Sequence, residues 1–535
     1  MDCEGEFFLK YQLLKGLNMQ QRSILIVSLF TLTSLSLSGN AGNSAEFEQW
    51  MKQETTSFQD YRDKRDKEFT GFLKNQWKEM QTFQGLVRDK TPKPVSMPKA
   101  PIKPSVPVRP VKELDPKPII KSPGTTPLVK TPVIEEPIVV PKPVIVKVPL
   151  IKPVPEPIKV LPAPVIKQSK GKHIHIKFYG QSLDFYYDPK LKVSLKRPYN
   201  EKSMSNFWSD MSKADYEGFL KQINVQRKPL VLNDWGYALL INTIAQKVHP
   251  GSKNDQSIFT WFFMTKAGYQ ARIAYDQNYI YLLMPSRQQL FGAPYFTFDK
   301  IRYYALSFDG IKQKPGKIYT YNGHYPGANQ RLDMSLNRAF NTGRQQKDRF
   351  LKFTYKGKTH RINVGYDQET VRYLKTYPQM DITLYFNSEL NQATANPLLK
   401  QLKPLVEGKS EEDAVNLILR FVQTAFKYKT DEQQFGIENY LFPEETLHYP
   451  YSDCEDRSVF FAWIVHNLLG LQVVGLDFPG HIAAAVHFNE TVSGDSINFN
   501  GKRFVVTDPT YINADAGMTM PAYKNKKPGV IRVLN

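Results

Sequence analysis

Residues 452–486 read SDCEDRSVFFAWIVHNLLGLQVVGLDFPGHIAAAV, and this stretch decides the architecture of the carboxy-terminal part of the chain. Acidic residues surround Cys454, and an apolar run of helical length follows it up to Gly470. A second apolar run, rich in Val and Ala, restarts after Gly480 at His481. The pattern predicts a buried helix that begins near Cys454 and ends at Gly470, followed by strands, one of which starts at His481.

These residue types in this order indicate cysteine-nucleophile chemistry. The unpaired N–H groups and the dipole of a helix amino terminus lower a thiol pKa, so we expect Cys454 to ionise readily. His481 is the candidate base, and Asp508, which ends the predicted strand in FVVTDPT (504–510), would orient the imidazole. The backbone N–H of Cys454 would hold the oxyanion, and Tyr451 is a weak candidate for the second donor.

Three motifs, DCEDRS, GHIAAAV and VVTDPTY, together resemble the transglutaminase-like superfamily over residues 411–521. The resemblance implies a papain-like fold, with Cys454 as nucleophile, His481 as base and Asp508 as the residue that orients the base. It also implies attack on an amide or ester carbonyl. One related group of periplasmic cysteine proteases shares the Cys-Glu-Asp motif and needs calcium. No loop of oxygen ligands in this sequence establishes that requirement, so we expect no metal and no cofactor.

Four other histidines are alternative candidates, either for the base or for metal ligands. His487 lies about 20 Å beyond His481 along an extended strand, so both cannot serve one thiol. His466 falls inside the predicted helix and is expected to pack there. His173 and His175 share one face of a predicted strand, but no third ligand follows nearby, so we do not expect a metal site there.

An internal duplication is indicated upstream of this region. The segment from Asp255 aligns without gaps with the segment from Arg457, each a helix, a glycine and a strand, and helices of similar character precede both. Two unrelated helices that each end at glycine remain the alternative. The pairs that match are Phe259 with Phe461, Trp261 with Trp463, and Gly268 with Gly470.

The upstream copy lacks the reactive groups. Ser252 stands where Cys454 would stand, and Tyr279 stands where His481 would stand. We therefore expect a degenerate module that serves packing or ligand binding.

The chain begins with features of an exported protein. A short basic segment at Met19 and an apolar stretch from Ser23 to Ser38 resemble a signal peptide, which we expect to be cleaved; an uncleaved anchor is the alternative. From Phe47 to Phe83 large apolar residues recur near helical spacing, which predicts one long amphipathic helix or a helical hairpin. This part resembles the module that precedes some envelope murein lytic transglycosylases.

A tract rich in Pro, Lys, Val and Ile follows and is expected to be an extended tether. The fold class is thus α+β. The expected segments are 1–45 leader and signal peptide, 46–90 amphipathic helical segment, 91–168 proline-rich linker, 169–305 degenerate transglutaminase-like module, 306–395 β-rich region, and 396–535 catalytic domain.

Composition narrows the partners and the compartment. The formal net charge is +20, but much of the excess Lys lies in the proline-rich tract and no nucleic-acid-binding motif accompanies it, so we expect no nucleic acid partner. The chain has two cysteines, and Cys3 precedes the signal segment, so the exported product would carry Cys454 alone and no internal disulfide. We expect a periplasmic or cell-envelope location, with membrane contact only if the signal is retained.

The sequence therefore predicts an exported cysteine peptidase or amidase that acts on an envelope protein or peptide. Two alternatives stay open. One is a noncatalytic envelope scaffold that binds peptidoglycan or an assembly complex. The other is a transglutaminase that cross-links proteins.

Overall fold

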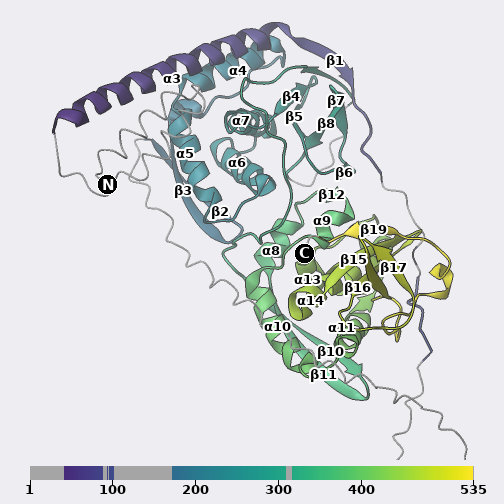
Figure 1. The fold of residues 1–535 in the computed structure, drawn as a ribbon. Coiled ribbons are helices and arrows are strands. Elements are labelled where there is room, and N and C mark those ends of the chain that lie inside the picture. Colours follow the sequence, from purple (N-terminus) through teal and green to yellow (C-terminus); the bar gives the residue numbers. More distant parts are fainter. Residues whose placement is uncertain (1–40, 88–92, 94, 102–170, 309–315, 534–535) are drawn as a thin grey trace, which may run out of the picture.

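The computed structural model describes residues 41–87, 93, 95–101, 171–308 and 316–533. These residues form mixed helix and sheet in two units, the upstream one at the top of Figure 1 and the carboxy-terminal one below it. The α+β class is thereby confirmed. The predicted signal segment lies outside the described residues. None of the helices within the described ranges is both long and apolar enough to cross a bilayer.

The upstream unit places helices against a six-stranded antiparallel sheet with the order β1-β9-β4-β5-β8-β7. The hairpin β2–β3 and the short strand β6 lie outside that sheet. The elements are α3 (Ala41–Asn75), β1 (Trp77–Gln81), β2 (Lys172–Phe178), β3 (Gln181–Tyr187), α4 (Glu201–Lys213), α5 (Tyr216–Arg227), α6 (Asp234–Val248), α7 (Lys253–Lys266), β4 (Arg272–Tyr275), β5 (Ile280–Pro285), β6 (Leu290–Phe291), β7 (Tyr295–Phe298), β8 (Ile301–Leu306) and β9 (Lys317–Tyr321).

The carboxy-terminal unit packs the buried helix α14 against a five-stranded antiparallel sheet with the order β17-β18-β16-β15-β19. A long hairpin, β10–β11, packs on α10 and α11. The elements are β10 (Gln346–Tyr355), β11 (Lys358–Asp367), α8 (Gln368–Leu374), β12 (Gln379–Met380), α9 (Ile382–Phe386), α10 (Gln392–Val406), α11 (Glu411–Ala425), β13 (Lys427–Tyr428), α12 (Asp431–Phe435), α13 (Pro443–His448), β14 (Tyr451–Ser452), α14 (Cys454–Leu469), β15 (Gln472–Phe478), β16 (His481–His487), β17 (Ser496–Phe499), β18 (Lys502–Thr507) and β19 (Gly529–Arg532).

Helix α14 has the bounds that the sequence predicts, for local reasons. Asp456 Oδ2 accepts a hydrogen bond from the N–H of Asp453 at 3.2 Å and so helps to close the first turn. Gly470 ends the helix in the left-handed conformation, with φ of 69°, and its N–H donates to the carbonyl of His466. Because apolar residues cover most of its circumference, the helix is buried between α11 and the sheet.

The two units share one topology, which is the arrangement that the predicted duplication requires. The order β9-β4-β5-β8-β7 in the upstream sheet corresponds strand for strand to β19-β15-β16-β18-β17, including the order along the chain. Helix α7 precedes β4 and packs on β4 and β5, as α14 precedes β15 and packs on β15 and β16. Helices α6 and α11 pack in turn on α7 and α14.

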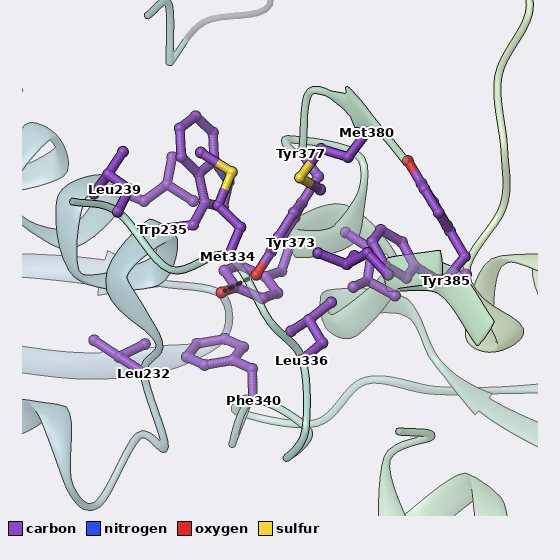
Figure 2. Packing of buried hydrophobic residues seen from close by; sticks show 14 of the residues in the cluster. Leu232, Trp235, Leu239, Met334, Leu336, Phe340, Tyr373, Tyr377, Met380 and Tyr385 are labelled. Carbon is purple, nitrogen blue, oxygen red and sulfur yellow. Dashed lines mark hydrogen bonds between the residues drawn. The ribbon is translucent and has the colours of Figure 1, made fainter. Parts of the chain in front are cut away.

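A continuous hydrophobic core joins the two units, as Figure 2 shows. Trp235 of α6 and Phe340 lie on the upstream side, and Tyr373 of α8 and Tyr377, which follows that helix, lie on the other, all at most 7 % exposed. The hydroxyls of Tyr373 and Tyr377 are 3.0 Å apart, and both are bonded to the side chain of Asn233. The interface is therefore apolar, and these two buried hydroxyls both have hydrogen-bond partners.

Two sequence predictions of local structure are wrong. Residues 77–81 are strand β1, which pairs with β9, rather than a continuation of the helix, although α3 does dock on the unit through Phe69 and Leu73. The second lies in the region expected to be β-rich, where Ile382 to Phe386 form the short helix α9. Asp381 accepts a hydrogen bond from the N–H of Thr383 and so caps this helix. The 306–395 region is therefore only partly β-rich.

The proline-rich tract is not a tether throughout. Lys93 and residues 95–101, here called the docked segment, pack on the carboxy-terminal unit. Lys99 forms a parallel bridge with Ile512, and Ala100 is buried against Tyr511 and Met520. Residues 102–168 of the predicted linker lie outside the described residues.

Candidate functional site

Cys454 is the first residue of α14, and its side chain is buried, with none of its surface exposed. Its thiol donates to Oε2 of Glu455, with 3.0 Å between sulfur and oxygen. It is in no disulfide. The thiol is therefore at the predicted place, the start of the helix, and its hydrogen is donated to a neighbouring carboxylate.

His481 and Asp508 lie in contact in the structure. His481 starts β16, and its Nε2 is 2.7 Å from Oδ2 of Asp508, which follows the end of β18. The other oxygen of Asp508 accepts the N–H groups of Thr510 at 2.8 Å and Tyr511 at 3.2 Å, which fixes the carboxylate. The Nδ1 atom of His481 is buried and makes no hydrogen bond within the part of the chain that the structure describes. Nδ1 is thus the nitrogen free to receive a proton.

Helix α14, which begins at Cys454, packs on β16, which begins at His481. Ser458, one turn beyond Cys454, donates from its hydroxyl to the carbonyl of Ile482, the residue after His481, at 3.1 Å. Tyr523 stacks on the imidazole, with centroids 4.9 Å apart and planes at 19°. Burial raises the pKa of Tyr523, and the charges of Cys454 and Asp508 add to the rise. The thiol itself is bonded to Glu455 rather than to the ring.

The electrostatics correct one prediction. We expected the helix amino terminus to lower the thiol pKa, but burial, reinforced by the charges of Glu455 and Asp453, raises the pKa of Cys454 well above its ordinary value. Burial of the thiol, together with two carboxylates within one residue of it, outweighs the dipole. For His481, burial lowers the pKa, but the carboxylate of Asp508 reverses the effect and the net pKa is raised.

An unexpected cation lies beside the thiol. The ammonium of Lys93 is 2.7 Å from Asp453 Oδ2, 2.9 Å from Glu455 Oε1, 3.1 Å from Glu438 Oε1 and 3.6 Å from Asp431 Oδ2. Burial opposes ionisation of Glu455, but Lys93 outweighs it and the pKa of that carboxyl is lowered. These four acids are here called the carboxylate pocket. The ammonium that contacts all of them comes from a residue that the sequence analysis assigned to the linker.

The described residues contain one group with metal-ligand spacing, formed by Asp431, Asp453 and Asp456, whose oxygens lie within 4.8 Å of one another. Burial and the neighbouring acids raise the pKa of Asp456 well above its ordinary value and that of Asp431 to about 11. The Lys93 ammonium supplies the positive charge that a metal would otherwise supply.

Two further site residues gave no signal in the sequence. Tyr428 of β13 has a buried hydroxyl without a hydrogen-bond partner in the described chain. Burial raises its pKa, and the charges of Cys454, Asp453 and Glu455 add to the effect. Arg457 is fully buried and donates to the carbonyls of Gln423 and Phe426 at 3.1 and 2.7 Å, which holds β13 beside α14. Tyr451, the weak oxyanion candidate, instead lies with its ring under the Lys429 ammonium at 4.1 Å.

The rival histidines are engaged elsewhere. His487 lies at the far end of β16, and its Nδ1 is 2.9 Å from the carbonyl of Arg503. His466 lies in the last turn of α14. On the β2–β3 hairpin, His173 and His175 both contact Asp184 Oδ1, at 2.8 and 3.0 Å, a carboxylate that the sequence pattern did not reveal.

The upstream unit carries no matching reactive set. Ser252 caps α7, with its hydroxyl accepting from the N–H of Asp255. Tyr279 lies just before β5 and is 59 % exposed, and Ser307 follows β8 as Asp508 follows β18, so the described part of this unit has no cysteine, histidine and aspartate at these three positions.

Comparisons of the chain with protein-family models, with curated proteins and with solved structures found no match.

Proposed function

We propose that this protein is a cysteine-nucleophile enzyme of the transglutaminase-like kind that cleaves an amide bond of a peptide or protein. A papain-like arrangement is part of the proposal: a cysteine at the start of a buried helix, facing an antiparallel sheet that carries the histidine and the aspartate. The observation that carries it is the buried His481–Asp508 pair, 2.7 Å apart, whose second imidazole nitrogen is free of hydrogen bonds in the described chain.

The chemistry follows from these positions. Nδ1 of His481 takes the thiol proton, and Sγ of Cys454 attacks the carbonyl carbon of the substrate. The oxyanion is held by the Cys454 N–H and by the hydroxyl of Tyr428. His481 then passes its proton to the departing amine as the C–N bond breaks, and Asp508 stabilises the imidazolium meanwhile. Water attacks the thioester, releases a carboxylic acid and restores the thiol.

The observed arrangement is a resting form. The thiol donates to Glu455, and its pKa is raised, so ionisation requires that this hydrogen bond be exchanged for one to His481. A small rotation of the Cys454 side chain is the step we propose for activation.

Hydrolysis is favoured over cross-linking. Burial lowers the pKa of the Lys93 amine, but Glu455 and Asp453 outweigh that effect, and the net pKa is raised. A lysine in the same position would therefore be held as an ammonium, which is not a nucleophile, whereas cross-linking needs a neutral amine. Export to the envelope remains a proposal that rests on the apolar segment 23–38 alone.

Turnover on a peptide mixture tests the proposal. The full chain would be incubated with proteome-derived peptides, and new amino termini identified by mass spectrometry. We expect new termini with the native chain and with His487→Ala, and none with Cys454→Ala or His481→Ala. Equal cleavage by Cys454→Ala would refute the proposal. The absence of cleavage by every chain, together with unaltered folding, would favour the noncatalytic scaffold.

A further inference from the structure

The docked segment reaches the catalytic residues from far away in the sequence. Lys93 and residues 95–101 lie along the same side of the carboxy-terminal unit as Cys454 and Asp508, more than 300 residues later in the chain. Residues on both sides of the segment, 88–92 and 102–170, lie outside the described ranges. The chain therefore supplies its own ligand-like peptide to the candidate site.

The backbone of the segment binds as an added strand does. The N–H of Ala100 donates to the carbonyl of Ile512 at 2.7 Å, and the N–H of Ile512 donates to the carbonyl of Pro98 at 3.0 Å. Ile512 follows Asp508 by four residues, so this pairing fixes the peptide beside the triad. Main-chain bonds of this kind accept many sequences, and side-chain pockets then set the specificity.

Side-chain contacts define two pockets along the segment. Ala100 is 4 % exposed in a small apolar cluster with Tyr511, Ala514 and Met520. Met97 receives the guanidinium of the buried Arg457, with 2.9 Å between Nη1 and Sδ. The main pocket, however, is the one that takes Lys93.

The carboxylate pocket is selective for a cationic side chain. The Lys93 side chain is 7 % exposed, and its ammonium meets four carboxyl groups, of which Asp453 is fully buried and Glu455 is 5 % exposed. Buried carboxylates without a countercharge are strongly unfavourable, so an empty pocket or a neutral occupant is disfavoured. The straight aliphatic stem of lysine can reach a point charge at the bottom of such a pocket.

We infer that the carboxylate pocket is a substrate subsite for a lysine side chain of an extended peptide, and that the docked segment occupies it in cis. The inference rests on the proposed function, because a peptide bound there is the one presented to Cys454. The substrate class is then a protein segment in extended conformation that carries a lysine at one fixed position. The docked side chain presents an ammonium to the carboxylates of Asp453 and Glu455, the residues on either side of Cys454, and an ammonium offers no carbonyl for the thiol to attack.

Competition follows from this occupancy. Cys454 has no exposed surface while the segment is docked, so a substrate and a small thiol reagent must both wait for the segment to leave. The site should therefore become more accessible when the segment is removed, and less accessible when the same peptide is supplied from solution.

The experiment releases the segment from the full chain. Specific protease sites are inserted within 88–92 and within 102–110 of a Cys3→Ser chain, and cutting both frees the segment, whereas cutting only the second leaves it attached. The readout is the rate at which iodoacetamide alkylates Cys454. We expect at least a tenfold faster rate in the doubly cut chain than in the singly cut chain. A synthetic peptide of residues 92–102 should restore the slow rate.

Variant peptides test what the pocket recognises. The Lys93→Gln peptide should give no protection at a concentration where the native peptide protects fully, and the Lys99→Gln peptide should protect as the native one does. Equal protection by the Lys93→Gln peptide would overturn the lysine subsite. The inference would also be overturned if the doubly cut chain kept its segment through gel filtration and its Cys454 reacted at the rate of the uncut chain.

Two further measurements keep the inference falsifiable and separate from turnover. In the uncut chain, Lys93→Gln should speed alkylation and Lys93→Arg should not; an unchanged rate in Lys93→Gln would contradict the inference. Calorimetry with a doubly cut Cys454→Ser chain should show the native peptide binding at least tenfold more tightly than the Lys93→Gln peptide. That result would support the subsite even if no peptide were cleaved, which would contradict only the proposed function.

Discussion

At the scale of single residues, the carboxylate of Asp508 sets both the orientation and the proton affinity of His481. Burial alone would lower the pKa of His481. The charge of Asp508 raises that pKa by a larger amount, so the net pKa lies above its ordinary value. The neutral ring is the base, and kcat/KM must therefore fall as the pH falls through that raised pKa. This gives the candidate site a testable pH dependence.

Asp508→Asn removes the charge and keeps an oxygen acceptor. We expect the acid limb of the kcat/KM profile to move to lower pH, because the imidazolium loses its stabilisation. We also expect kcat to fall by about 10²- to 10⁴-fold, the usual contribution of general acid–base catalysis. The exposed Asp210→Asn in α4 is the control and should match the native profile. An acid limb that stays in place would show that Asp508 does not tune the base.

The hydroxyl of Tyr428 is the second residue-scale prediction. Tyr428→Phe keeps the ring and removes the donor, so kcat should fall by about 10²- to 10³-fold with little change in KM, as for other lost oxyanion donors. Tyr451→Phe is the matched control, because its ring lies under Lys429 on the adjoining strand. A larger loss in Tyr451→Phe than in Tyr428→Phe would reverse the assignment.

The sequence predicted the three residues of the candidate triad because each lies in a short motif at the end of an element. Tyr428, Tyr523 and Lys93 carry no such local signal. They reach the site through parallel pairing of β13 with β14, through stacking and through docking of a distant segment, all of which depend on the tertiary fold. The thiol pKa was mispredicted because burial, which depends on the tertiary fold and is not visible in a helix pattern, is the largest effect on it, and the charges of Glu455 and Asp453 act in the same direction.

At the scale of elements, α13 contains a buried acid that links stability to pH. Burial raises the pKa of Glu445 to about 8, against the weaker opposing effect of its hydrogen bond from the N–H of Phe442. Folded Glu445 keeps its proton in a range where the unfolded chain has lost it. Its contribution is therefore present at low pH and is lost as the pH rises from about 4.5 through about 8.

Glu445→Gln should remove this loss, because the amide oxygen still accepts from Phe442 and carries no charge to bury. We expect the melting temperature of the variant to fall less between pH 6 and pH 9 than that of the native chain. Glu432→Gln in α12 serves as a comparison on a solvent-exposed helix position. Parallel melting curves for the native chain and Glu445→Gln would contradict the raised pKa.

Elements were predicted well where the pattern was local. Helices α6, α7 and α14 have helical apolar spacing and clear end signals, such as Gly470. Strand β1 was missed because its partner β9 lies far along the chain, and nothing in residues 77–81 announces that pairing. Helix α9 was missed because five residues of alternating polarity are compatible with either structure, and only the Asp381 cap decides.

At the scale of the whole molecule, the two units share a core and should unfold together. Phe340 is 2 % exposed, and its ring lies 4.5 Å from that of Tyr373 and 5.7 Å from that of Phe178. No polar layer separates the units at this interface in the described structure, where the tyrosine hydroxyls are satisfied by one another and by Asn233. We therefore expect the two units to unfold as one cooperative body.

Phe340→Ala should lower the free energy of unfolding by about 3–5 kcal/mol, the usual cost of emptying a buried aromatic site. Denaturant unfolding would be followed by tryptophan fluorescence and by reactivity of Cys454. We expect one shared midpoint for both signals in the native chain, and a shared lower midpoint in the variant. Phe350→Ala, at a position 82 % exposed, is the control. Two separate midpoints would show that the units unfold independently.

The central claim is that the Cys454 thiol is activated by the His481 imidazole. The most direct measurement is the rate at which a peptide-based electrophile forms a covalent bond with Cys454 near neutral pH. The docked segment is the same in the native chain, His481→Ala and His487→Ala, so their comparison reports the histidine alone. We predict that His481→Ala slows the reaction by at least 100-fold and that His487→Ala leaves it unchanged. Equal rates in all three chains would contradict the claim.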